Sequence, residues 1–322
     1  MEKNMEESKI TQSMDGEQNE EVLYTRKKQE EMLETGVQRE SVTFPNGEIT
    51  MAGDLYLPRD FDESKQYAAI ICVHTGTGVK EQVSGDYAAM LAGEGYVTLA
   101  YDASYQGESG GEPRFLENPE ARISDVSRAV DFFETLSYVD SERIGVFGVC
   151  AGGGYATKAA CLDHRIKALG TVSSAQMGGE PYEESKDRPD YYVSVIPEAD
   201  ESTAESNPQF AHFAKDAYEY YKTERGQWPT SESRIPYVSF KYLEGFNAYD
   251  LVPTELVQPV MMVVGENAMT RILSDNAIAN ANVARSRELV VIDGAYHFDL
   301  YDKEEYVSQA MANLTRFYGE NL

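Results

Sequence analysis

The chain has 322 residues, of which 42% are hydrophobic, and this is enough to bury the core of one large α/β domain. Its formal net charge of -27 at pH 7 argues against nucleic acid and anionic membrane as partners, because both would repel such a surface. The three cysteines, Cys72, Cys150 and Cys161, have no disulfide or metal-ligand spacing. Together with the lack of a signal-peptide pattern and of a membrane-length apolar run, this predicts a cytoplasmic protein without a metal site.

The first part of the chain divides into a polar lead-in and a hairpin. Residues 1–36 are rich in charged side chains and poor in apolar ones, which predicts a disordered lead-in that becomes helical toward its end. Residues 37–44 and 49–57 then alternate apolar and polar side chains around Pro45-Asn46-Gly47. Asn-Gly supplies the positive φ of a tight turn, so an antiparallel hairpin is expected to open the sheet.

The rest of the chain alternates apolar runs with helical patterns. This order predicts a doubly wound, mostly parallel sheet of about eight strands. Further strands are expected at 67–73, 96–101, 144–148, 166–173, 259–264 and 288–292, and helices at 86–93, 119–136, after residue 150, at 274–284 and at 303–318. The loop 102–113 is expected at the surface.

Residues 174–250 interrupt the alternation. They hold the only tryptophan, Trp228, many tyrosines and scattered helical patterns. This composition predicts a helical cap inserted between core segments 37–173 and 251–322; a crossover helix with long loops is the alternative.

The central motif is Gly148-Val149-Cys150-Ala151-Gly152, at the junction of a predicted strand and helix. It has the form of a G-x-S-x-G nucleophile elbow with cysteine in the serine position. The N-terminus of the following helix is expected to stabilise a Cys150 thiolate. The alternative is a glycine-rich turn with an inert, buried cysteine.

The chain resembles the α/β-hydrolases, and within them the dienelactone hydrolase-like branch that carries cysteine at the elbow. The resemblance rests on the elbow, on residues 74–82 and 107–114, and on His297-Phe298-Asp299-Leu300-Tyr301-Asp302, and it spans about residues 37–322. It implies the α/β-hydrolase fold and a hydrolase-type site, whereas the substrate depends on the variable cap.

The general base is expected to be His297, which follows the last predicted strand and comes after the nucleophile in the chain. His74, His164 and His212 are expected to be structural. The position where most α/β-hydrolases carry the aspartate of the triad is Ala268 here. Glu266 is therefore the first choice for the carboxylate that orients the imidazole, and Asp250, Asp275 and Asp299 are the alternatives.

The oxyanion hole is predicted from backbone N–H groups. One belongs to Ala151, and the second to the loop after His74, at Gly76 or Thr75, unless its glycines mark only a tight turn. Thr75 and Asp102 could also contact substrate or support the site. Glu81 is included because dienelactone hydrolases place a glutamate near the resting thiol.

The predicted reaction is cleavage of a small ester, lactone or thioester through an acyl-enzyme on Cys150, with no cofactor. Acyl transfer by the same site is an alternative. A second alternative, motivated by Ala268, is a ligand-binding or thiol-sensing protein on a hydrolase scaffold. A small acyl compound is the expected partner, and a homo-oligomer is left open.

Overall fold

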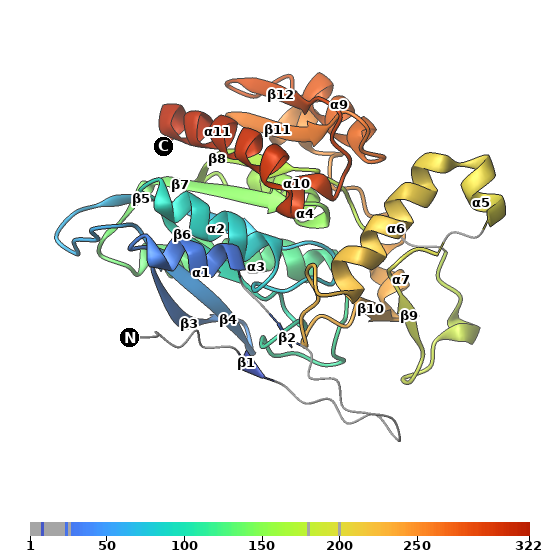
Figure 1. Ribbon diagram of the computed structural model, residues 1–322. Helices are drawn as coiled ribbons and strands as arrows, with labels where there is room; N and C mark the ends of the chain where they lie inside the picture. The colour runs from blue at the N-terminus through green and yellow to red at the C-terminus, as the bar shows by residue number, and fades with distance from the viewer. Residues whose placement is uncertain (1–7, 10–22, 25–26, 179–180, 199–200) are drawn as a thin grey trace.

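The computed structural model describes residues 8–9, 23–24, 27–178, 181–198 and 201–322. Its central element is an eight-stranded sheet with the order β12-β11-β8-β7-β5-β6-β4-β3 (Figure 1). All neighbouring pairs are parallel except β3–β4 and β4–β6. The predicted doubly wound, mostly parallel sheet is confirmed. Its strands are β3 (Gln38–Asn46), β4 (Ile49–Leu57), β5 (Tyr67–Val73), β6 (Val97–Tyr101), β7 (Val139–Val149), β8 (Ile166–Val172), β11 (Val260–Gly265) and β12 (Arg287–Ile292).

Helices cover both faces of this sheet. One face carries α1 (Lys27–Glu34), α2 (Val83–Gly93) and α11 (Glu304–Asn321), and the other carries α3 (Pro119–Glu134), α4 (Ala151–Leu162), α8 (Val252–Glu255) and α9 (Arg271–Asn280). Strand β5 shows why both faces are apolar. Ile70 and Cys72 point into the first core, whereas Ile71 and Val73 point into the second. A strand buried on both sides must be apolar throughout, which is the pattern that predicted it.

The hairpin at the start of the sheet is also confirmed. β3 and β4 pair antiparallel from Gln38↔Leu57 to Asn46↔Ile49. Gly47 in the turn has φ +60°, a conformation that glycine adopts without steric cost.

The lead-in is packed onto the core where the structure describes it in full. Helix α1 places Gln29, which is fully buried, against α2. The Gln29 amide donates to the Glu81 carbonyl oxygen at 2.8 Å and accepts from the Tyr56 hydroxyl at 2.8 Å. A short pair, β1 (Ser8–Lys9) and β2 (Leu23–Tyr24), precedes it, and the rest of the predicted disordered stretch lies outside the described residues.

The 174–250 segment lies at the end of the sheet toward which the β7 arrow points in Figure 1. It contains η1 (Glu184–Lys186), α5 (Glu201–Ser206), α6 (Pro208–Lys222) and α7 (Ser239–Leu243). It also contains an antiparallel pair, β9 (Tyr192–Ser194) with β10 (Arg234–Pro236), which a purely helical expectation missed. The pair is stabilised by Arg234, whose guanidinium lies 4.5 Å from the centre of the Tyr192 ring.

In the described part of the chain, no helix combines the length and the hydropathy needed to cross a bilayer.

Candidate active site

The elbow forms where β7 passes into α4. Cys150 has φ +53°, a left-handed conformation that is uncommon for a side-chain-bearing residue. A Cβ atom on Gly148 would lie 2.4 Å from the Gly152 carbonyl oxygen, and one on Gly152 would lie 2.3 Å from that of Val73. Both glycines are therefore required by close backbone contacts. The turn holds Cys150, partly exposed, at the N-terminus of α4.

Three hydrogen-bonding groups surround the Cys150 sulfur. They are the Tyr301 hydroxyl and the backbone N–H groups of Ala151 and Gly76, which belong to different parts of the chain. Burial raises the pKa of the thiol, and these hydrogen bonds lower it by less, so the net shift is upward. This differs from the expectation that the helix N-terminus would favour a thiolate, because desolvation of the anion outweighs the local donors.

The imidazole of His297 is buried and has two described partners. Its Nδ1 lies 2.8 Å from Thr270 Oγ1, and its Nε2 lies 3.1 Å from the Tyr301 hydroxyl. Burial lowers the pKa of His297 to about 3, since no described carboxylate pairs with the ring. The resting pair is therefore a neutral thiol and a neutral imidazole.

The structure does not bring Glu266, the first choice for the triad acid, to His297. Its exposed carboxylate accepts from the Gly294 N–H at 3.0 Å. The hydroxyl of Thr270, four residues later, takes the position at Nδ1.

The three alternative carboxylates are likewise held by other groups. Asp250 pairs with Lys158, and Asp275 lies 3.4 Å from Arg271. Asp299 accepts from the Tyr296 N–H at 2.8 Å and pairs with Lys303 at 2.5 Å. Described contacts thus give the imidazole a hydroxyl partner in place of a carboxylate.

The 74–78 loop, which carries Gly76, is fixed by several hydrogen bonds. His74 Nε2 accepts from the Ala103 N–H at 2.9 Å, so Nδ1 carries the proton and donates to the Thr75 carbonyl at 2.7 Å. Burial, the largest cause, lowers the pKa of His74 well below its usual value, which keeps this tautomer neutral. The Tyr221 hydroxyl of α6 donates to Thr75 Oγ1 at 2.7 Å. Thr75 therefore links the loop to the 174–250 segment.

A buried ion pair also holds the 74–78 loop in place. The guanidinium of Arg122, on α3, donates to the His74 carbonyl oxygen at 2.7 Å and to Glu117 at 3.2 Å. Tyr155 stacks on this guanidinium at 4.7 Å and donates to Glu117 at 2.7 Å. Arg122 and Glu117 are 1% and 0% exposed, so each charge depends on the other for compensation.

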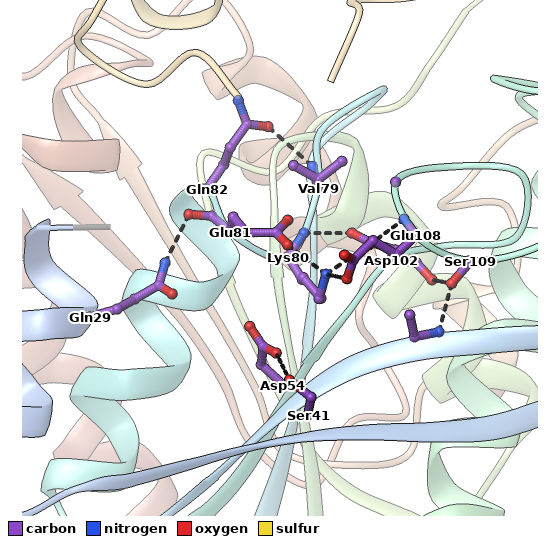
Figure 2. Close-up of polar contacts among 12 residues, drawn as sticks. Gln29, Ser41, Asp54, Val79, Lys80, Glu81, Gln82, Asp102, Glu108 and Ser109 are labelled. Atoms are coloured by element: carbon purple, nitrogen blue, oxygen red, sulfur yellow. Dashed lines mark hydrogen bonds and ion pairs between the residues drawn. The ribbon is translucent and has the colours of Figure 1, made fainter. Parts of the chain in front are cut away.

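Glu81 and Asp102 belong to a separate charged cluster around Lys80 (Figure 2). Lys80 Nζ lies 2.5 Å from Glu81, 3.1 Å from Asp102 and 2.6 Å from Glu108. These three carboxylates are close enough together to hold a metal ion, but the lysine ammonium contacts all three and supplies the positive charge. The cluster fixes the start of the 102–113 loop. That loop is less exposed than expected, because Ser109 is buried and donates to the Asp102 carbonyl.

Aromatic side chains pack against the His297 ring. Phe213 of α6 lies 5.1 Å from it and Phe298 4.9 Å from it, measured between ring centres. A cavity of about 440 Å³ lies between α1, α2 and the loop after α6, with Gln82, Tyr220, Trp228 and Tyr301 in its walls. Its lining residues include Tyr301 but not Cys150.

Sequence reasoning missed Tyr301, Thr270 and Arg122. Tyr301 lies in the short helix α10 (Asp299–Asp302), and His297 lies in the turn just before it, so the two side chains are close in the sequence and meet locally. Thr270 gave no signal because a hydroxyl was not expected where an acid was sought. Arg122 lies on a helix whose apolar face was recognised, but a buried charge on that face has no signature in the sequence.

Comparison with known proteins places this chain in a family. The family model of the dienelactone hydrolase family matches residues 52–214. YcjY of Escherichia coli K12 is 39% identical over 300 residues, covering 86% of this chain and 96% of YcjY. The crystal structure of PA2218 from Pseudomonas aeruginosa has a TM-score of 0.70 at 29% identity and covers 89% of this chain and 94% of its own. The α/β-hydrolase GrgF of Penicillium sp. sh18 matches with a TM-score of 0.70 at 22% identity, over 88% of this chain and 99% of GrgF, and shows the same fold.

Proposed function

Because the chain belongs to the dienelactone hydrolase family and is a hydrolase of the α/β-hydrolase fold, we propose that it cleaves a small ester, lactone or thioester through an acyl-enzyme on Cys150. The observation that carries this proposal is that the backbone N–H groups of Ala151 and Gly76 both hydrogen bond to the Cys150 sulfur, from two separate parts of the chain. Two such donors beside a nucleophile form the arrangement needed for an oxyanion.

In the acylation step, the thiol proton of Cys150 passes to Nε2 of His297 and the sulfur attacks the carbonyl carbon. The electron pair of the carbonyl double bond moves to its oxygen, which the two N–H groups stabilise. When that pair returns, the bond to the leaving group breaks, and the imidazolium supplies the proton that the leaving group takes. Water, deprotonated by His297, then attacks the thioester and releases the acid, which restores the thiol.

The neutral resting pair sets a condition on this mechanism. Burial disfavours both charges of a thiolate–imidazolium pair, so forming this pair inside the site requires stabilisation by other groups. The oxyanion donors supply it in the transition state, when negative charge leaves the sulfur and reaches the oxygen. The reaction therefore depends on a bound acyl group rather than on a permanently ionised nucleophile.

The 174–250 segment is proposed as the cap that selects the substrate. Phe213 and Tyr221 belong to α6 of this segment, and they contact His297 and Thr75. The aromatic enclosure favours a neutral acyl group of modest size, since an anion would also meet the strongly acidic surface. The acyl group is received by water, by an alcohol or by a thiol, depending on which of these acceptors enters the site.

One observation favours a second candidate function. Thr270 gives His297 a neutral partner, so the imidazolium lacks the carboxylate that usually stabilises it. A ligand-binding or thiol-sensing protein would not need this carboxylate, because it does not turn over a substrate. In that case Cys150 would react with an acyl probe without turnover.

The test is a kinetic comparison on p-nitrophenyl esters and acyl thioesters with short acyl chains, from acetyl upward. Cys150→Ala and His297→Ala are expected to abolish turnover. Cys161→Ala is the matched control, because Cys161 lies on the same helix and burial raises its pKa to about 12. Equal rates for wild type and Cys150→Ala would exclude the covalent mechanism, and a single acylation without turnover would support the sensing role.

A further inference from the structure

We propose that Tyr301 is a catalytic residue that carries the proton between Cys150 and His297. This inference rests on the function proposed above. Its hydroxyl lies 3.1 Å from His297 Nε2 and is hydrogen bonded to the Cys150 sulfur, so it stands between the nucleophile and the base. The described partners of the imidazole are Thr270 and Tyr301, which makes this hydroxyl the link between the ring and the thiol.

The hydrogen-bonding capacity of the groups gives the direction of the relay. A hydroxyl can donate one proton and accept another at its lone pairs. When His297 Nδ1–H donates to Thr270 Oγ1, Nε2 is the acceptor, and the Tyr301 hydroxyl donates to it. The tyrosine oxygen then accepts the thiol proton as its own proton moves to Nε2. The products are a thiolate, an imidazolium and a neutral tyrosine, so protons and charge balance.

The surroundings of Tyr301 suit this role. The residue is 1% exposed, and its ring packs against Phe298 at 4.8 Å and Tyr220 at 4.9 Å. Burial and the neighbouring Cys150, Tyr221 and Tyr220 raise the pKa of Tyr301 well above its usual value. The phenol therefore does not ionise on its own, and the two proton transfers occur together. The packing restrains the ring, so that the oxygen stays beside both partners, as such a transfer requires.

A purely structural role makes different predictions. If Tyr301 only fills space, Tyr301→Phe keeps the ring and lets Cys150 and His297 exchange a proton directly or through water. Activity would then survive. If the hydroxyl carries the proton, its removal interrupts acylation while the ring packing and the oxyanion donors stay in place.

The experiment compares wild type, Tyr301→Phe and the control Tyr318→Phe with p-nitrophenyl acetate. Tyr318 is another fully buried tyrosine, and its hydroxyl donates to the Val146 carbonyl oxygen at 2.7 Å inside the core. Tyr301→Phe is expected to lower kcat by about 100-fold, the scale of one general acid–base step, with KM little changed. Tyr318→Phe is expected to stay within about threefold of wild type, because its lost hydrogen bond lies outside the proton path.

A second measurement uses wild type alone and so does not depend on how the variant folds. The acylation rate is measured in mixtures of H₂O and D₂O. Two protons in flight predict a curved dependence on the deuterium fraction, whereas one proton predicts a straight line. A straight line, or a Tyr301→Phe enzyme as fast as wild type, would overturn the relay. Failure of the proposed function is distinguishable, because Cys150 of wild type would then acquire no acyl group, or would keep the acyl group without turnover.

Discussion

The buried Arg122–Glu117 pair offers a test that separates stability from activity. Replacing Arg122 by methionine keeps much of the length of the side chain but leaves the Glu117 carboxylate, 0% exposed, without its counter-charge. Breaking one partner of a buried pair costs about 3–5 kcal/mol of unfolding free energy. For a chain of this size the expected decrease in Tm is on the order of 10 °C.

The double variant Arg122→Met/Glu117→Gln removes the unpaired charge. Glutamine can still accept from the Tyr155 hydroxyl, so most of the lost stability is expected to return. Activity is not expected to return. The His74 carbonyl has lost its 2.7 Å donor, and the loop that presents the Gly76 N–H is free to shift. A displaced oxyanion donor predicts a loss in kcat of about tenfold or more in both variants.

Urea unfolding and ester hydrolysis on the same preparations measure the two effects. Urea gives the free energy of unfolding for wild type, single and double variant. A single variant as stable as wild type would show that the Glu117 charge does not depend on Arg122. A double variant with wild-type kcat would show that Arg122 does not position the loop.

Three further predictions concern the imidazole and the elbow. Thr270→Val removes the hydrogen-bond partner of His297 Nδ1 and is expected to lower kcat about tenfold. Thr270→Asp is expected to raise the pKa of His297, which moves the acidic limb of the pH–rate profile to higher pH; an unchanged kcat or an unchanged profile would contradict this. Because the folded pKa of His297 is about 3 and lies below the unfolded value, its contribution to stability is present above pH ~6.5 and is lost as the pH falls. Wild type should therefore lose about 2 kcal/mol more than His297→Asn between pH 7 and 5 in urea titrations, and equal losses would refute the shift. Gly152→Ala places a Cβ atom 2.3 Å from the Val73 carbonyl oxygen and should lower the free energy of unfolding by about 1–3 kcal/mol. Gly76→Ala places a Cβ atom 2.5 Å from the sulfur of the flexible Met177 side chain and should lower it by less, so the reverse order in thermal melts would count against the close backbone contacts of the elbow.

Much of the fold was predictable from local pattern. The run at 67–73 corresponds residue for residue to β5, and Asn46-Gly47 marks the β3–β4 turn. Both signals are local: strand periodicity and turn chemistry are properties of consecutive residues. The β9–β10 pair was not predictable, because three-residue strands from distant parts of the 174–250 segment carry no periodicity.

The site was predictable only where neighbouring residues in the sequence determine the local backbone geometry. The Cys150 elbow follows from the close contacts of Gly148 and Gly152 around one turn. The partner of His297 Nδ1 does not, because it depends on which side chain at the end of β11 faces the ring. Glu266 and Thr270 lie on the same connection, and only tertiary packing selects the hydroxyl of Thr270. The upward pKa shift of Cys150 is a similar case, since burial is a property of the assembled fold.

The measurement that tests the covalent mechanism most directly is the mass of the protein quenched during turnover of p-nitrophenyl acetate. His297→Ala is included because this activated ester can still acylate its cysteine slowly, while loss of the base stops deacylation and accumulates the intermediate. An added acetyl group that maps to Cys150, and that is absent from Cys150→Ala, is the predicted result. Hydrolysis with no modified cysteine, or an acetyl group on another residue, would contradict Cys150 as the nucleophile.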